Sequence, residues 1–147
     1  MAEGTESDIP EKLGIEPGMT VVVLHEPNWF QYDLGELPDG VTVHRDSFER
    51  PADLFLIFAA TPDEAERGFQ RALTVLPADG AVWVVWERDP PETFYEHVSE
   101  QTLRELFGDS GLVPDESSVI NETWQGLRFV VAEENRGRWE QVRTVRD

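Results

Sequence analysis

Three apolar runs constrain the fold of this chain more than any other feature of its sequence. They are Met19–His25 (MTVVVLH), Asp53–Ala60 (DLFLIFAA) and Ala81–Trp86 (AVWVVW). Each run is nearly continuous, whereas a strand with one wet face alternates apolar and polar side chains. Continuous runs are typical of strands covered on both faces, as in a parallel sheet between two layers of helices. A shorter run, Val41–His44, predicts a fourth strand.

Helical patterns lie between the predicted strands. The clearest begins at Thr61–Glu64 (TPDE), which combines an N-cap hydroxyl, a proline at the first helical position and a glutamate placed to complete a capping box. A second helix is predicted to begin at Ser99 and to end near Gly108 or Gly111. A third, shorter helix is predicted over about Asn28–Leu37.

The pattern changes after the second helix. Two consecutive strands, Leu112–Glu122 and Thr123–Ala132, are predicted to pair antiparallel across a tight turn. The whole order predicts an α/β fold, a three-layer sandwich whose sheet is mostly parallel and ends in a C-terminal antiparallel strand pair. We expect a disordered polar lead over residues 1–10, one domain over 11–134 and a basic tail over 135–147.

Composition excludes several classes of function. The 147 residues suffice for one domain, and they include no cysteine, which excludes disulfides, thiolate metal sites and thiol nucleophiles. The formal net charge of -18 argues against binding nucleic acid or anionic membranes. The sequence shows no signal-peptide pattern, and it has no apolar stretch long enough to form a membrane-spanning helix. We therefore expect a cytoplasmic protein.

The acidic excess is distributed unevenly, and Lys12 is the only lysine. A GC-rich genome explains the preference for arginine, and adaptation to high salt is the alternative.

The C-terminal tail, residues 135–147, has a net charge of the opposite sign to the rest of the chain and carries an isolated aromatic residue. Such a tail suggests docking on a protein partner or self-association. The residues concerned are Arg136, Arg138, Trp139 and Arg143. In the simpler alternative, Trp139 covers the edge of its own domain.

Polar and aromatic residues follow the predicted strands, at the sheet edge where α/β folds bind ligands. The candidates for this crevice are His25, Glu26, Asn28, Trp29, Asp46, Thr61 and Glu87. With His44, some of them offer metal or acid–base ligands. Strand ends are polar, however, wherever the chain meets water, so we predict neither a metal site nor catalytic residues.

Several segments resemble the Rossmann-like fold of class I methyltransferases. Leu13–Val23 (LGIEPGMTVVV) is similar to the lead into their first strand, and Asp53–Phe58 is similar to a later strand that often begins with aspartate. Leu73–Val85 (LTVLPADGAVWVV) is similar to their helix, proline–glycine turn and following strand. Only Arg45–Ala52 separates the second and third predicted strands, so the methyltransferase sheet would lack an element there.

A closer resemblance is to the uncharacterised bacterial family catalogued as domain of unknown function 3052. Glu11–Gly18 (EKLGIEPG), Asp79–Trp83 and Trp124–Val130 (WQGLRFV) carry this resemblance. It covers roughly residues 9–133 and implies the fold more than an activity.

The methyltransferase resemblance implies S-adenosylmethionine held over a glycine-rich turn after the first strand, where side chains would block the approach of the cofactor. Here that strand is followed by His25–Phe30 (HEPNWF), and the next glycine is Gly35. The resemblance also implies an acid after the second strand that holds a ribose; Asp46 fits, but acids are common in this chain. We therefore expect no cofactor and a non-catalytic binding or interaction domain. The alternative is an adenosylmethionine-dependent methyltransferase-like enzyme with an atypical cofactor loop.

Overall fold

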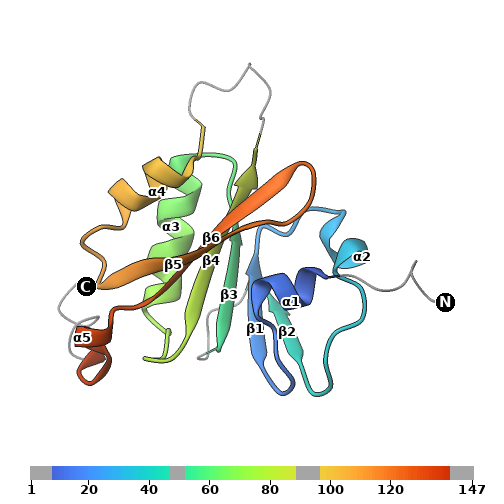
Figure 1. Ribbon diagram of the computed structural model, residues 1–147, viewed down its shortest axis with the longest axis horizontal. Helices are drawn as coiled ribbons and strands as arrows, with labels where there is room; N and C mark the ends of the chain where they lie inside the picture. The colour runs from blue at the N-terminus through green and yellow to red at the C-terminus, as the bar shows by residue number, and fades with distance from the viewer. Residues whose placement is uncertain (1–7, 47–51, 89–96, 140–147) are drawn as a thin grey trace.

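The computed structural model describes residues 8–46, 52–88 and 97–139, and within these residues six strands form one sheet (Figure 1). The strands are β1 (Thr20–Leu24), β2 (Thr42–Arg45), β3 (Leu54–Phe58), β4 (Ala81–Glu87), β5 (Leu112–Val119) and β6 (Trp124–Val131). The helices are α1 (Ile9–Leu13), α2 (Phe30–Leu34), α3 (Pro62–Leu73), α4 (Glu100–Leu106) and α5 (Glu133–Arg136).

The sheet has the order β2-β1-β3-β4-β6-β5. Strands β2, β1, β3 and β4 are parallel, and β6 lies antiparallel between β4 and β5. This topology confirms the prediction of a mostly parallel α/β sheet that ends in an antiparallel strand pair. The three continuous apolar runs form β1, β3 and β4, and the shorter run Val41–His44 overlaps the edge strand β2.

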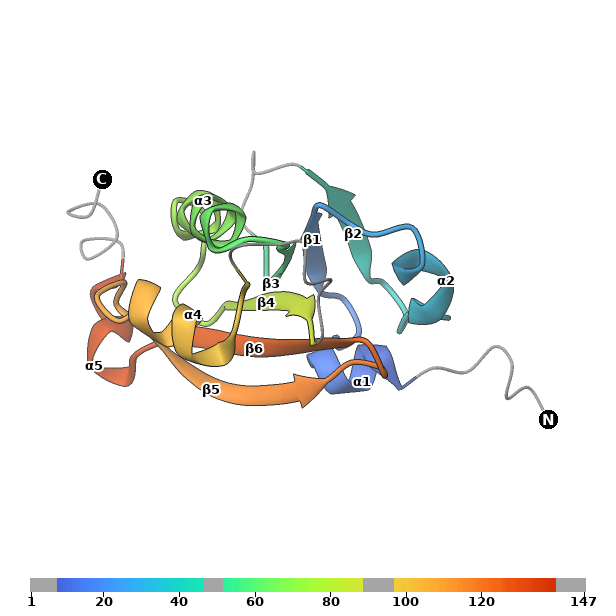
Figure 2. The same cartoon turned by 90° about the horizontal axis from the view of Figure 1, so that it is seen from above.

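Helices cover both faces of the sheet (Figure 2). Helices α3 and α4 pack on one face, and α1 and α2 pack on the other, so each face has its own apolar core. Trp86 belongs to the first core, under α3 and α4, and Trp83 belongs to the second, under α1 and α2, so the two tryptophans of β4 point to opposite faces. The Trp83 indole donates a hydrogen bond of 2.9 Å to the carbonyl of Leu13 and so attaches α1 to the sheet.

Helix α3 begins as its sequence predicts. Thr61 is the N-cap, and its hydroxyl accepts a hydrogen bond of 3.2 Å from the amide of Glu64. The Glu64 carboxylate in turn accepts from the amide of Ala60, one residue before the expected partner of a capping box. The hydroxyl of Ser99 caps α4 in the same way by accepting from Thr102, so both predicted helix starts are confirmed.

Both ends of the folded unit extend beyond the predicted boundaries. Helix α1 begins at Ile9, inside the predicted disordered lead, because Ile9 is buried with 4% exposure in the second core. At the other end, α5 and Trp139 belong to the folded unit although the domain was predicted to end at residue 134. Residues 1–7 and 140–147 lie outside the described residues. Among the described helices, none is long and apolar enough to cross a membrane.

Candidate functional site

The carboxyl ends of β1, β2, β3 and β4 meet at one edge of the sheet, because these strands run parallel. Ligands of open α/β sheets bind at this edge. The structure places His25 directly after β1, Asp46 directly after β2 and Glu87 at the end of β4. Thr61 follows β3 and begins α3. The residues predicted from the sequence therefore share one edge, but their contacts differ.

His25 and Asp46 are joined through the backbone. The amide of His25 donates to Oδ1 of Asp46 at 3.2 Å, and the amide of Asp46 donates to the carbonyl of Val23 at 2.8 Å. Both residues have left-handed backbones, with φ of 60° and 56°. Such a conformation costs a residue with a side chain about 1 to 2 kcal/mol. The Asp46 carboxylate thus holds the end of β1 in place.

Glu26 is engaged by the neighbouring strand. Both of its carboxylate oxygens accept hydrogen bonds from the guanidinium of Arg45, and the Glu26 side chain is only 14% exposed. This hydrogen bond raises the pKa of Arg45 above its ordinary value, while partial burial opposes the increase. Glu26 therefore has a structural partner across the β1–β2 edge.

Trp29 lies over the ends of the strands and packs in an aromatic cluster with Phe30, Phe58 and Trp124. Its ring centroid is 5.7 Å from Phe30, 6.2 Å from Phe58 and 5.6 Å from Trp124. Phe58 ends β3, and Trp124 begins β6 opposite the end of β4, so the cluster lies at the carboxyl ends of β3 and β4. We call these four residues the Trp29 cluster.

The Trp29 cluster is largely removed from solvent. Phe30 and Phe58 are buried, with 1% and 3% exposure, and Trp29 is half-buried. The indole N–H of Trp29 is buried and has no hydrogen-bond partner among the described residues. Asn28 beside it is exposed.

Sequence reasoning missed Phe58 and Trp124 as members of this site. A signal for both was present. Phe58 is the last residue of a parallel strand, and Trp124 begins a strand that runs antiparallel to β4, so both residues come to the same edge. In the β4–β6 ladder Trp124 is directly opposite Glu87.

The remaining predicted residues do not form a catalytic constellation in the described part of the chain. The Thr61 hydroxyl is occupied as a helix cap. Glu87 is half-buried beside Trp124, and His44 is half-buried on β2. No group of three His, Cys, Asp or Glu side chains among the described residues is placed to hold a metal ion.

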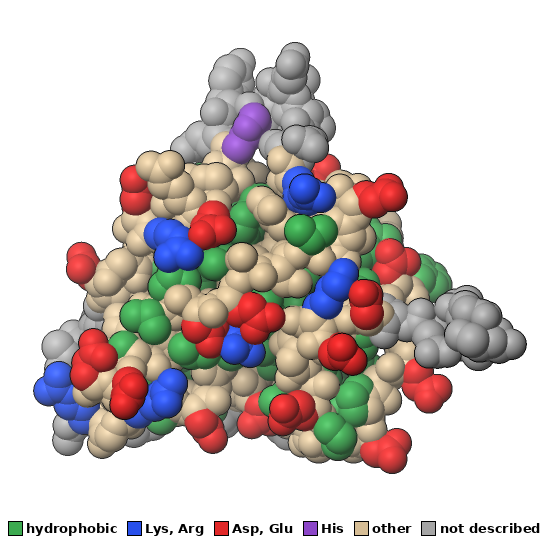
Figure 3. Space-filling model, viewed as in Figure 1, with side chains coloured by type: hydrophobic (Ala, Val, Ile, Leu, Met, Phe, Trp, Pro, Cys, Tyr) green, Lys and Arg blue, Asp and Glu red, His purple; other side chains and the backbone are tan. Residues whose placement is uncertain are grey.

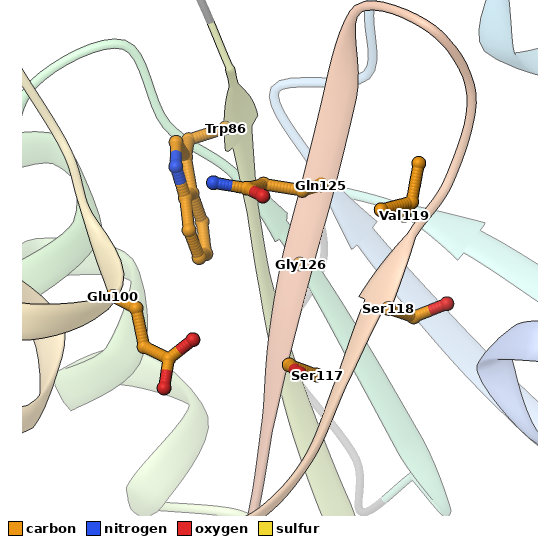
Figure 4. Close-up of a pocket in the computed structure, with 7 residues that line it drawn as sticks. All are labelled: Trp86, Glu100, Ser117, Ser118, Val119, Gln125 and Gly126. Carbon is orange, nitrogen blue, oxygen red and sulfur yellow. The ribbon is translucent and has the colours of Figure 1, made fainter.

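A hollow lies on the face of the sheet that carries α3 and α4 (Figure 4). Its volume is about 130 Å³, and its lining residues are Trp86, Glu100, Ser117, Ser118, Val119, Gln125 and Gly126. The Glu100 carboxylate already binds Arg104 at 2.8 Å. Trp86 belongs to the first core, whereas the Trp29 cluster packs in the second core on the other face. The sheet therefore separates this hollow from the Trp29 cluster.

The tail residues divide into exposed and buried groups. Arg136 and Arg138 are exposed, whereas Trp139 is only 2% exposed and its indole donates a hydrogen bond of 2.7 Å to the carbonyl of Leu76. Of the two alternatives, the structure has the simpler one: Trp139 covers the edge of its own domain, and its buried side chain is not available to a partner. Arg143 lies outside the described residues.

Comparison with known proteins supports the fold but not a family. No protein-family model and no curated protein matches the chain. Among solved structures, the pyocyanin biosynthetic protein PhzM superimposes with a TM-score of 0.58 at 14% identity over 89% of this chain and 55% of that chain. CalO1, a methyltransferase in calicheamicin biosynthesis solved in its SAH-bound form, superimposes with a TM-score of 0.57 at 16% identity over 89% of this chain and 54% of that chain.

A third similar structure is magnesium protoporphyrin IX methyltransferase from Synechocystis PCC 6803 with bound SAM. It gives a TM-score of 0.51 at 13% identity over 79% of this chain and 71% of that chain. The chain spans about half the length of PhzM and CalO1. At these identities the likeness concerns the fold alone, which is methyltransferase-like.

Proposed function

We propose that this chain is a non-catalytic binding or interaction domain on a methyltransferase-like fold, with its own Trp29 in the place where such folds hold a cofactor. The observation that carries the proposal is the Trp29 cluster at the carboxyl edge of the sheet. The absence of a glycine between His25 and Phe30 agrees with it, since close approach of a ligand to the backbone needs small residues there.

The energetics of displacement support the same conclusion. Aromatic pairs in this distance range contribute about 0.5 to 1.5 kcal/mol each beyond their buried area. A ligand that removes the Trp29 ring from its three partners would lose about 3 kcal/mol, which corresponds to about two orders of magnitude in affinity. Any cofactor would have to overcome that loss.

The second candidate is an adenosylmethionine-dependent, methyltransferase-like enzyme with an atypical cofactor loop. Two observations favour it. CalO1 and the magnesium protoporphyrin IX methyltransferase hold SAH and SAM on a similar fold. The buried Trp29 N–H lacks a partner, so movement of the ring towards water or a ligand would satisfy a costly group.

Calorimetric titration of the full chain with adenosylmethionine and adenosylhomocysteine separates the two candidates. The proposal expects no binding up to millimolar ligand, and millimolar or tighter binding contradicts it. In parallel, Trp29→Ala should lower the free energy of unfolding by about 2 to 4 kcal/mol, because it empties the cluster. Tyr32→Ala is the matched aromatic control, since Tyr32 is 77% exposed and should change stability little.

Two further expectations belong to this proposal. Membership in the domain of unknown function 3052 family rests on the sequence segments quoted above. A cytoplasmic location rests on the acidic charge and the lack of cysteine.

A further inference from the structure

A shallow, open groove lies between α1 and the residues that follow α2, on the opposite side of the sheet from α3. Each of these helices has five residues, and the chain turns away from each through a glycine of positive φ, Gly14 at 78° and Gly35 at 73°. The space left beside the short helices has a volume of about 400 Å³. The groove is lined by Pro10, Glu11, Ile15, Glu36, Leu37 and Pro38.

The lining combines an apolar floor with an acidic rim. Pro10 and Ile15 are buried members of the floor, and Leu37 and Pro38 are half-buried. Glu11 and Glu36 are exposed, one from each side of the groove. We call these six residues the α1–α2 groove. A rim of carboxylates around apolar side chains suits a segment that carries both cations and an apolar residue.

The segment of the chain that forms the groove is strongly acidic. Residues 8–40 contain seven acids and a single base, Lys12, whereas residues 97–139 contain eight acids and four bases. Lys12 is already engaged, since its ammonium lies 3.4 Å from Asp8 and donates to the carbonyl of Ile120. Figure 3 shows acidic side chains spread over this face of the molecule, including the side where α1 and α2 lie.

We propose that the α1–α2 groove binds a basic segment of a partner protein, with an apolar residue in the groove and Lys or Arg side chains against Glu11 and Glu36. A second copy of this chain is the less suitable occupant, because two bodies of net charge -18 repel at long range, whereas a basic partner is attracted. The inference rests on the proposed binding role and names its partner class, but it does not involve the Trp29 cluster.

The test uses the full chain and two fluorescein-labelled peptides. One has a Leu-Pro-Leu centre with two arginines on each side, and the other has glutamines in place of the arginines. Fluorescence anisotropy measures binding to the wild type, to the double variant Glu11→Gln/Glu36→Gln and to the control Glu133→Gln/Glu134→Gln. The control changes the net charge equally on exposed residues of α5, far along the chain from the groove.

Binding of the arginine peptide is expected to weaken about five- to tenfold in Glu11→Gln/Glu36→Gln and less than about twofold in the control. Amide resonances of Glu11, Ile15 and Leu37 should shift on titration. Equal weakening in both double variants, or no binding by the wild type, overturns the groove as the site. Sedimentation of the wild type as a dimer that the groove variant dissociates identifies a second copy and also overturns the proposal. The adenosylmethionine titration is unaffected by any of these results.

Discussion

His25 and Asp46 combine an unusual backbone with an exposed position at the edge of the candidate site. Left-handed residues other than glycine store strain, and such strain is concentrated at functional or tightly constrained sites. In this chain the constraint is visible, since the Asp46 carboxylate accepts from the His25 amide and the Asp46 amide bonds to Val23. The strain is therefore explained by the closure of the β1–β2 edge, without a ligand.

Replacing His25 by glycine tests this explanation. Glycine adopts φ of 60° without steric cost, which recovers about 1 to 2 kcal/mol, while its greater freedom in the unfolded chain costs about 0.5 to 1 kcal/mol. His25→Gly should therefore raise the free energy of unfolding by about 0.5 to 1 kcal/mol in urea titration. His25→Ala keeps the strain and should give no increase. A marked loss of stability in His25→Gly would indicate that the imidazole makes an interaction of its own.

Helix α3 determines how closely the first core packs against the sheet. Gly68 is buried where α3 crosses β1 and β3, and a Cβ atom added there would lie 2.8 Å from side-chain carbons of Ile57 and Leu24. Real Cβ atoms do not approach so closely, so either the helix or the two side chains must move. The sequence pattern of α3 shows an amphipathic helix but not this contact.

The expected consequence is that Gly68→Ala destabilises the protein despite the better helix propensity of alanine. Overpacking of this kind costs about 1 to 3 kcal/mol, which exceeds the gain of about 1 kcal/mol from propensity. Gly137→Ala is the matched control, since a Cβ atom at Gly137 meets nothing within 4 Å. Thermal melting of the two variants measures the difference. A stability of Gly68→Ala equal to that of the control would mean that α3 is not held tightly against β3.

At the scale of the whole molecule, a net charge of -18 on 147 residues makes self-repulsion the main electrostatic effect. The ion pairs of the described residues are few and mostly exposed, and the best-placed of them joins Arg128 to Asp115 at 2.8 Å. That hydrogen bond raises the pKa of Arg128 above its ordinary value, against the effect of partial burial. Exposed pairs contribute little each, so they do not offset the repulsion between so many carboxylates.

Added salt should therefore stabilise the chain. Raising sodium chloride from about 10 to 500 mM shortens the Debye length from about 30 to about 4 Å, which screens the repulsion. The melting temperature measured by calorimetry is expected to rise by about 3 to 6 °C, corresponding to about 1 to 2 kcal/mol. A decrease in melting temperature would show that local ion pairs dominate. Genome composition and a saline habitat, the two explanations of the acidity, both predict an increase in the melting temperature, so this measurement does not distinguish them.

Local patterns in the sequence specify most of the strands and two of the helices of this fold. The continuous apolar runs specified β1, β3 and β4, because a strand covered on both faces has no solvent-facing positions. Thr61 and Ser99 specified two helix starts through hydrogen bonds within one turn. The odd spacing of Trp83 and Trp86 placed them on opposite faces, since strand side chains alternate.

Only the tertiary structure decided what the aromatic and charged residues do. Trp139 stands among arginines in sequence, yet Leu76, 63 positions away, accepts its indole N–H. Trp29 meets Trp124 because an antiparallel strand returns the chain to the carboxyl edge. The α1–α2 groove unites residues 10–15 with 36–38. Sequence periodicity reports which side of an element is buried, whereas these contacts depend on which elements become neighbours, and that is a property of the packed sheet.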